Sequence, residues 1–425
     1  MRPKFPPLAR AASLLLVLSV SSAAAKTLYV AKAGDGSDGQ SWESAYNSIN
    51  AALIVSVTND EIRITAETYS ENIDVATPLT IVGGFESGVG ESSLATGRTM
   101  VTPKGEGRVI ELLADSELVN FHVTGGFGTA GVGVRAFQST STIRNCIMND
   151  NGGGTVAGGV SCYKASLMIV DCTIANNTAQ MEGGGVFCLD ARVIVRDTLV
   201  SGNRCLGSPG DPRIGVPPQP GAGGGLSLTM SQAEISNCLF VENDAEVGSD
   251  LYYGGVGSLR CTNCTFGSTT FPNVRIGSSA RGSLQIFNSI LWGHEISFQG
   301  PQGIISYSNV RDGIPGDGNL SENPLFVDPD NGDFRLQAGS PCIDSASTSG
   351  PATDLDGNPR PFDVPGVGTE GPGAFDMGAY EFTLLPTPAP TFVNERSDID
   401  GSDRVDAVDL LILLGDWMKS TGPSD

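Results

Sequence analysis

The sequence lacks the features of several common protein classes. Charged residues make up only 17% of the 425 residues, and no segment between residues 60 and 335 has the 3.6-residue apolar period of amphipathic helices. Glycine does not recur at every third position, which excludes collagen, and a hydrophobic content of 40% excludes global disorder. After Val20 no apolar run is long enough to span a bilayer. The net charge of −22 opposes binding to nucleic acids and to anionic lipid surfaces.

Turn-forming residues are abundant instead. The 56 glycines and 25 prolines are typical of many short strands joined by tight turns. Residues 1–25 have the pattern of a bacterial secretory signal, because three basic residues precede an apolar run from Leu14 to Val20 and the small residues Ala23–Ala25 follow. We therefore expect the mature protein to be secreted or to lie at the cell surface, and not to be an integral membrane protein. A retained membrane anchor is the alternative interpretation of this segment.

A repeat of about 26 residues occupies the middle of the chain. Its marker is an Asn or Asp at intervals of 25, 26, 26, 40, 26, 25 and 21 residues: Asn120, Asn145, Asp171, Asp197, Asn237, Asn263, Asn288 and Asn309. The long interval contains an insertion between Asn203 and Gly223. Columns of apolar or small residues keep the same register two positions before the marker, one after it and three after it. A second Asn column stands at Asn151, Asn177, Asn203 and Asn243.

Columns of this kind predict a coil of short strands. Like residues in successive coils stack at the spacing of parallel strands, about 4.8 Å. Apolar columns then form a continuous core, and Asn suits the turns because it tolerates left-handed backbone angles. Paired glycines, such as Gly184-Gly185, permit tight corners. The sequence therefore predicts an all-β protein, a parallel β-helix solenoid with about 26 residues per coil.

The repeats resemble those of right-handed β-helix proteins of the pectin-lyase-like superfamily. Gly184-Gly185-Val186 and Phe240-Val241-Glu242-Asn243 also resemble the repeats of polymorphic outer-membrane proteins. The segments FVDPDNGDFRLQAGSPCIDSAS, DLDGNPRP and DMGAYEF, between residues 326 and 382, resemble the C-terminal part of the exported bacterial family called choice-of-anchor Q. The opening YVAKAGDGSDGQSWESAYNSINAAL is similar to the start of that family. These resemblances imply a right-handed solenoid.

The predicted domains follow from this pattern. Residues 26–59 form an N-terminal cap, with an amphipathic helix from Trp42 to Val55 or, alternatively, a loop-and-strand entry. The β-helix spans 60–340, with a loop insertion near 206–222 and a last coil closing around 320–340. An irregular C-terminal cap (341–382) and a Pro-rich linker (383–393) precede a small α-helical module at 394–425.

The C-terminal module contains a candidate calcium loop. Its oxygen ligands stand at positions 1, 3, 5, 7, 9 and 12 of such a loop: Asp398, Asp400, Ser402, the Arg404 carbonyl, Asp406 and Asp409. With the Leu-rich segment that follows, the module resembles one half of a dockerin, which implies calcium and a cohesin-like or other cell-surface partner. It departs from that pattern at Ser402 and Asp403 and in having one copy. An Asp-rich helix-capping turn is the alternative.

A second motif, Asp354-Leu-Asp356-Gly-Asn358, begins like a calcium loop but lacks the helix and the acidic twelfth position. It is a candidate second metal site, and a set of Asx turns is the alternative.

Nine cysteines accompany the repeat. Three pairs stand one repeat apart: Cys146/Cys172, Cys162/Cys188 and Cys238/Cys264. They are either disulfides between coils or buried thiols in core columns.

Catalytic motifs are scarce. The sequence contains no nucleophile elbow and no zinc motif, and its two histidines, His122 and His294, stand in unrelated contexts. Asp171 and Asp197, one repeat apart, are expected to stack about 5 Å from each other, the separation of the carboxyl groups in a retaining glycosidase. The simpler interpretation is that both replace Asn in the turns.

The sequence thus predicts an exported, non-catalytic β-helix that presents a binding or adhesion surface to a carbohydrate or protein and is attached through the calcium loop. A polysaccharide lyase or glycoside hydrolase on the same fold is the alternative. A third hypothesis is a passive surface-layer or adhesion rod that has no saturable ligand.

Overall fold

The computed structural model describes residues 24–86, 97–128, 133–210, 213, 217–267, 282–293, 303–311, 313–347, 349–368 and 375–384, and the backbone of 277–278. The predicted signal segment up to residue 23, His294, and the linker and calcium-loop module from residue 385 onward lie outside these residues. Within them, no helix is long and apolar enough to cross a membrane.

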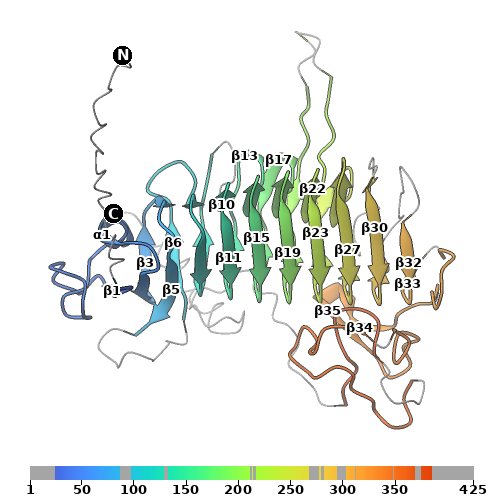
Figure 1. The fold of residues 1–425 in the computed structure, drawn as a ribbon. Helices are drawn as coiled ribbons and strands as arrows, with labels where there is room; N and C mark the ends of the chain where they lie inside the picture. The colour runs from blue at the N-terminus through green and yellow to red at the C-terminus, as the bar shows by residue number, and fades with distance from the viewer. Residues whose placement is uncertain are drawn as a thin grey trace, which may run out of the picture.

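Parallel strands stack in three long sheets along one axis (Figure 1), and the described residues thus confirm the predicted solenoid. Sheet A contains β1 (Thr27–Val30), β2 (Glu61–Thr65), β5 (Thr80–Phe85), β8 (Ser116–Val119), β11 (Thr140–Arg144), β15 (Ser166–Val170), β19 (Arg192–Arg196), β23 (Gln232–Ser236), β27 (Ser258–Thr262), β30 (Ser283–Phe287) and β32 (Ile304–Ser306). Sheet B contains β3 (Thr68–Ser70), β6 (Thr99–Thr102), β9 (Phe121–Thr124), β12 (Ile147–Asn149), β16 (Thr173–Ala175), β20 (Leu199–Ser201), β24 (Leu239–Val241), β28 (Thr265–Phe266), β31 (Ile290–Leu291) and β33 (Asn309–Val310). Sheet C contains β4 (Ile73–Val75), β7 (Ile110–Leu112), β10 (Val134–Phe137), β14 (Val160–Tyr163), β18 (Val186–Leu189), β22 (Leu226–Thr229), β26 (Leu251–Gly254) and β29 (Gly277–Ser278).

A fourth, shorter sheet joins B to C in the middle coils. It contains β13 (Gly154–Val156), β17 (Thr178–Glu182), β21 (Arg204–Cys205) and β25 (Asp244–Ala245). The predicted insertion leaves the solenoid between β21 and β22 and protrudes from it (Figure 1). At its base Ser208 and Gln219 exchange two backbone hydrogen bonds of 2.8 and 2.9 Å.

The apolar columns read from the sequence form the core. The residues two positions before each marker are all buried: Ile143, Ile169, Val195, Ile235, Cys261 and Ile286. The column three positions after the marker is buried as well: Met148, Ile174, Val200, Phe240, Phe266 and Leu291. Strand pairing keeps this register, since Ile143 pairs with Ile169 and Ile169 with Val195. All nine cysteines are buried and carry free thiols, so the structure has the thiol alternative and no disulfide.

The marker column forms a turn between sheets A and B. From Asn120 to Asn288 all seven markers have left-handed φ values between 49° and 63°, a conformation that Asn and Asp tolerate. The prediction is wrong at Asn309, which lies in β33 and pairs with Ile290. Tyr307 occupies that turn instead, with φ 50°, because the last coil is shorter than the repeat.

The second Asn column is a buried ladder. The Nδ2 group of Asn151 donates to Asn177 Oδ1, that of Asn177 to Asn203, and that of Asn203 to Asn243, each at 3.0 Å. Each Nδ2 also donates to a backbone carbonyl of the preceding coil, as Asn203 does to Ile174 O at 2.8 Å. The ladder ends at Asp250, whose Oδ1 accepts from Asn243 Nδ2 at 2.9 Å. These bonds satisfy amide groups that burial would otherwise destabilise.

The N-terminal cap contains a shorter helix than predicted. Helix α1 (Ile49–Val55) begins after Ser48, whose hydroxyl accepts a hydrogen bond from Ala51 N, and buries Ile49 and Ala52. The preceding residues cannot be helical because Tyr46 N and O bond to Tyr29 O and Ala31 N, both at 2.9 Å. Trp42, the predicted start of the helix, instead packs against Tyr29 and Phe85.

The C-terminal segment also differs from the prediction. Residues 326–340 do not form a last coil, because β34 (Phe326–Asp328) and β35 (Asp333–Leu336) pair antiparallel around the 3₁₀ turn η1 (Pro329–Asn331). The described residues between 326 and 384, here called the C-terminal lobe, pack beside the solenoid rather than over its end (Figure 1). Their buried side chains form one cluster with Leu239, Val241 and Ile290 of sheet B. Apolar burial along the coils thus holds this segment.

Candidate functional site

A groove lies where the carboxyl ends of sheet A strands meet the C-terminal lobe. It has a volume of about 500 Å³ and is lined on one side by residues of β19, β23, β27 and the turn after β19: Arg196, Asp197, Ser236, Arg260 and Thr262. Residues 349–353 of the lobe line the other side. The groove therefore exists only because the lobe packs beside the coils.

The repeat explains why these side chains face outward. In β19, Val193 and Val195 point into the core, so Arg192, Ile194 and Arg196 point away from it. Strand pairing places Arg196 beside Ser236, and Ser236 beside Thr262. The result is a row of polar side chains that crosses neighbouring coils along the groove.

Two arginines supply the positive charge of the groove. Arg260 Nη1 donates to Gln285 Oε1 at 3.0 Å, and its guanidinium lies 4.7 Å from the centre of the Phe287 ring. The Arg196 side chain is exposed and forms no ion pair with a described residue. Planar guanidinium groups donate several hydrogen bonds in fixed directions, which suits hydroxyl and carboxylate oxygens of a ligand.

Asp171 and Asp197, the candidate catalytic pair, occupy successive turns with φ 53° and 52°. Burial, followed by the negative charge of Asp197, raises the pKa of Asp171, while Arg144 and Arg196 oppose the rise. Only Asp197 lines the groove, and its Oδ1 accepts a hydrogen bond of 2.7 Å from Asn237 Nδ2. Asn takes the same left-handed conformation in five other coils. The need for a residue that tolerates this turn therefore accounts for Asp171 and Asp197 without a catalytic role.

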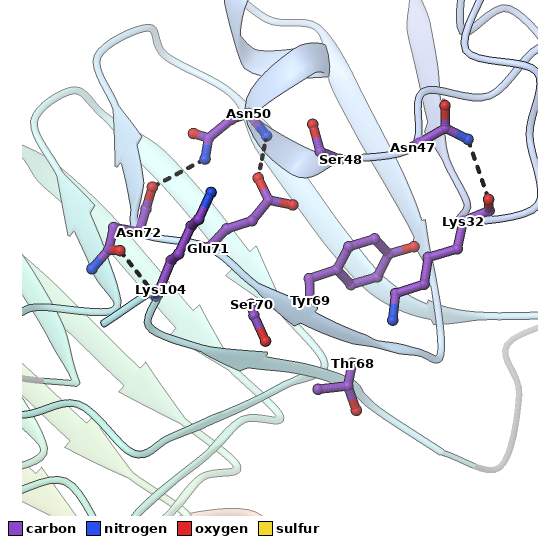
Figure 2. A pocket seen from close by; sticks show the side chains of 10 residues that line it. All are labelled: Lys32, Asn47, Ser48, Asn50, Thr68, Tyr69, Ser70, Glu71, Asn72 and Lys104. Carbon is purple, nitrogen blue, oxygen red and sulfur yellow. Dashed lines mark hydrogen bonds between the residues drawn. The ribbon is translucent and has the colours of Figure 1, made fainter. Parts of the chain in front are cut away.

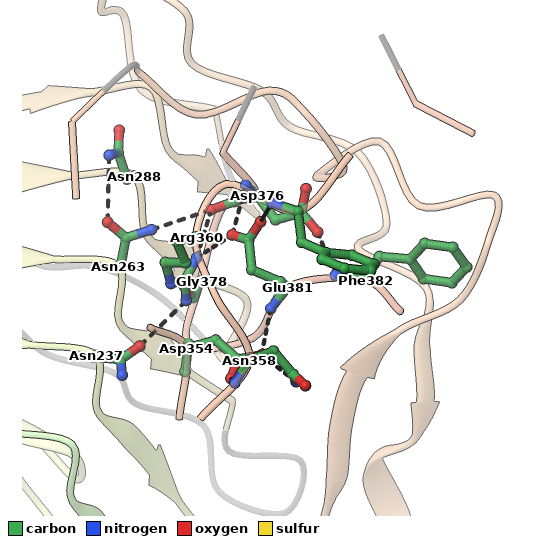
Figure 3. Close-up of polar contacts among 12 residues, drawn as sticks. Asn237, Asn263, Asn288, Asp354, Asn358, Arg360, Asp376, Gly378, Glu381 and Phe382 are labelled. Carbon is green, nitrogen blue, oxygen red and sulfur yellow. Dashed lines mark hydrogen bonds and ion pairs between the residues drawn. The ribbon is translucent and has the colours of Figure 1, made fainter. Parts of the chain in front are cut away.

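Asn237 connects the groove to a buried polar cluster in the lobe (Figure 3). Arg360 Nη2 donates to Asn237 Oδ1 at 3.2 Å and to Gly378 O at 2.9 Å. Its Nη1 pairs with Glu381 Oε1 at 2.5 Å, and both side chains are fully buried. Burial, and then the charge of Glu381, raises the pKa of Asp376 to about 8.

The turn column also binds the lobe directly (Figure 3). Asn263 Nδ2 donates to Asp376 O at 3.1 Å, and Asn288 Nδ2 donates to Ser349 O at 2.8 Å. The Asn markers therefore have a second role as hydrogen-bond donors that position the lobe. The repeat pattern predicts turns at these positions, but neither this second role nor the groove residues Arg196 and Arg260. The signal for Arg196 was available, since it stands one position before an Asp marker and so faces outward.

The candidate second metal site forms hydrogen-bonded turns. Asp354 Oδ1 accepts from Asn358 N at 2.7 Å, and Asp354 Oδ2 accepts from Asn358 Nδ2 and Glu381 N, both at 2.9 Å. Asp356 lies in the same turn but adds no third ligand, since the described residues contain no group of three His, Cys, Asp or Glu side chains placed to hold a metal ion. The hydrogen bonds match the Asx-turn alternative. The predicted calcium ligands from Asp398 to Asp409 lie outside the described residues.

Comparison with known proteins agrees with this architecture. Residues 109–295 match the family model described as right handed beta helix region. This part of the chain is a right-handed parallel β-helix. The crystal structure of pectate lyase Pel9A matches with 14% identity and a TM-score of 0.51, over 84% of this chain and 96% of that chain. A pectin methylesterase from Aspergillus niger matches with 16% identity and a TM-score of 0.34, over 66% of this chain and 88% of that one.

No curated protein matches the sequence. At this level of identity, the likeness to the pectate lyase is a likeness of fold. The function of this β-helix therefore has to be argued from its own groove.

Proposed function

We propose that this protein is an exported, non-catalytic β-helix that binds a polysaccharide in the groove between sheet A and the C-terminal lobe. The observation that carries the proposal is the lining of the groove. Arg196, Arg260, Asp197 and neighbouring Ser and Thr side chains present hydrogen-bonding groups at the spacing of successive coils. Sugar hydroxyls are matched by such a row of donors and acceptors.

The fold supports a role with polysaccharides. A protein named as a pectate lyase has the same β-helical architecture over most of both chains. Solenoids present long surfaces on which an extended polymer contacts several coils at once. The proposal transfers only the class of ligand, a polysaccharide, and not the reaction.

The arrangement of carboxylates favours binding over cleavage. A glycosidase needs two carboxyl groups facing one sugar linkage, but only Asp197 of the stacked pair lines the groove. That carboxylate already accepts a hydrogen bond from buried Asn237. Hydrolysis remains the second candidate, because the raised pKa of Asp171 beside Asp197 is a feature that an acid catalyst also has.

We further propose that the C-terminal module attaches the protein to an extracellular or cell-surface partner of cohesin-like type in a calcium-dependent manner. The support is the spacing of Asp398, Asp400, Ser402, Arg404, Asp406 and Asp409. A groove for a polymer and a separate attachment module together describe a protein that holds a glycan at a surface.

The test measures polysaccharide binding and cleavage with the mature chain. Affinity electrophoresis against neutral and acidic polysaccharides identifies a retained ligand, and the Arg196→Ala and Arg260→Ala variants are expected to weaken retention about tenfold each. Arg192→Ala is the matched control, because it removes the same side chain from the opposite end of β19. Assays for new reducing ends and unsaturated products accompany each polysaccharide.

Each outcome is decisive for the proposal. Retention that depends on Arg196 and Arg260 but not on Arg192, without products, supports it. Equal loss in all three variants, or no retention of any polysaccharide, contradicts the assignment of the groove. Product release that disappears in Asp171→Asn or Asp197→Asn establishes the enzyme instead.

A further inference from the structure

A second polar pocket (Figure 2) lies beside α1 and β3, at the end of the solenoid away from the C-terminal lobe (Figure 1). Its volume is about 630 Å³, and ten residues line it, from α1, β3 and the adjoining loops. Lys32 and Lys104 stand at opposite sides of it, with Ser70 and Tyr69 between them (Figure 2). Nothing in the groove described above contributes to this pocket.

The two lysines are unusual in this chain. The described residues contain four lysines, Lys26, Lys32, Lys104 and Lys164, and two of them line this one pocket. Among the described residues neither ammonium group has an ion-pair partner. Lys32 Nζ instead lies 5.7 Å from the centre of the Tyr69 ring. Against the effect of burial, hydrogen bonds and then the Lys32 charge lower the pKa of Glu67, although Lys32 and Glu67 are not within ion-pair distance. A protein with a net charge of −22 therefore places two cations without a close ion pair around one cavity.

The carboxylate of the pocket does not take up this charge. Glu71 Oε1 accepts the backbone N–H of Ile49, and Oε2 accepts that of Asn50, both at 2.9 Å. Glu71 thus holds the start of α1 against β3, with each oxygen engaged by the backbone. Among the described residues, the Lys104 ammonium group has no carboxylate partner, and that of Lys32 has none within ion-pair distance.

The loops that carry the lysines are fixed in place. Asn47 Nδ2 donates to Lys32 O at 3.2 Å. On the other side Asn72 Oδ1 accepts from Lys104 N at 3.0 Å, and Asn72 O accepts from Asn50 Nδ2 at 3.1 Å. Binding to a site that is already ordered costs less conformational entropy than binding to loops that must be immobilised.

We propose that this pocket binds an anionic sugar. Its acid group accepts a charge-assisted hydrogen bond from a lysine ammonium group at the side of the pocket, and such a bond is stronger than one between neutral groups. Its hydroxyl groups face the uncharged donors and acceptors of the wall, which include Ser48, Ser70 and Asn50. The exposed rim at Thr68, Ser70 and Lys104 admits one unit of a longer chain. This site is independent of the groove and stands whether or not the groove binds a polysaccharide.

The experiment is a calorimetric titration of the mature chain with a glucuronate oligosaccharide. The methyl ester of the same oligosaccharide has the same hydroxyl groups but no charge, and a sulfated oligosaccharide distinguishes the kind of acid group. Inorganic phosphate and sulfate are titrated as simple anions. Binding is expected for an acidic oligosaccharide, with an affinity that falls as salt is added.

The variant for this test is Lys32→Gln/Lys104→Gln, in which we expect at least about a tenfold loss of affinity. Its control, Lys26→Gln/Lys164→Gln, makes the same change in net charge outside the pocket. Gln is compatible with position 164, because Gln138 has φ 51° and Lys164 has φ 50° in corresponding turns.

Loss of binding in the pocket variant alone supports the proposal. Equal losses in both double variants show a general charge effect and overturn it. So does equal binding of the methyl ester, and so does binding of phosphate or sulfate without any preference for the acidic sugar. No binding of any acidic oligosaccharide also overturns it. The Arg196→Ala variant separates this site from the groove, since the part of the binding that is lost in Lys32→Gln/Lys104→Gln is expected to be unchanged in it.

Discussion

Asp250 at the end of the Asn ladder makes the stability of the solenoid depend on pH. Other coils have glycine at the corresponding corner position, as at Gly185 and Gly225. The Asp250 side chain is fully buried. Its Oδ1 accepts from Asn243 Nδ2, while its Oδ2 has no hydrogen-bond partner among the described residues. Burial raises the pKa of this carboxyl group from 3.8 to about 7.

The direction of the effect follows from the two pKa values. The unfolded chain releases the proton of Asp250 near pH 3.8, whereas the folded protein keeps it until about pH 7. Proton binding by Asp250 therefore adds to the free energy of unfolding. This contribution is complete below pH 3.8 and is lost as pH rises through 7. Between the two pKa values, each pH unit lowers this contribution by about 1.4 kcal/mol. The contribution therefore falls by about 2–3 kcal/mol between about pH 5 and pH 8.

The perturbation is Asp250→Asn, which keeps the oxygen that Asn243 requires and removes the titrating group. Urea unfolding of both proteins at the two pH values gives the difference in their free energies of unfolding. We expect this difference to shift by about 2–3 kcal/mol in favour of the variant as pH rises. Asp190→Asn is the control, because Asp190 is exposed and Asn fits its left-handed turn. A difference that is the same at both pH values would refute the burial argument.

Three further predictions test other parts of the structure. Arg360→Met leaves the Glu381 charge buried without its partner, so the free energy of opening of the C-terminal lobe, measured by hydrogen exchange, is expected to fall by about 3–5 kcal/mol. Arg360→Met/Glu381→Gln is expected to recover part of this loss. Asn203→Ala removes the four buried hydrogen bonds that the Asn203 side chain makes with Asn177, Ile174 and Asn243, and is expected to lower the free energy of unfolding by about 3 kcal/mol; no change in denaturation would contradict the ladder's role. Calcium is expected to bind the full mature chain and not its Asp398→Ala/Asp409→Ala variant; titrations that do not differ would reject the loop.

The solenoid was predictable because each coil repeats the same local requirements. Alternating side-chain direction places Val193 and Val195 in the core, and the turn at Asp197 needs a residue that accepts a left-handed backbone. These requirements depend on neighbours in sequence or one repeat away. The register fails only at Asn309, where the last coil is shorter and Tyr307 takes the turn.

The C-terminal lobe could not be placed in the same way. Its position depends on contacts between residues far apart in the chain, such as Arg360 and Asn237, which are separated by 123 residues. No periodicity marks such a pair. The groove depends on the same packing, so Asp197 was found through the repeat, whereas the wall formed by residues 349–353 was not.

The extent of α1 was also misjudged, for a local reason. An apolar pattern from Trp42 to Leu53 fits a helix, but backbone pairing of Tyr46 with β1 holds the first half in an extended form. Tertiary pairing thus overrides helical periodicity where the chain must complete a sheet.

The central claim is that the groove, rather than another face of the solenoid, binds the polysaccharide. The most direct measurement is hydrogen exchange of the mature chain with and without a saturating amount of the polysaccharide that it retains. The account predicts added protection at the carboxyl ends of β19, β23 and β27 and in residues 349–353. Protection confined to sheet C, with no change at Arg196 and Arg260, would contradict it.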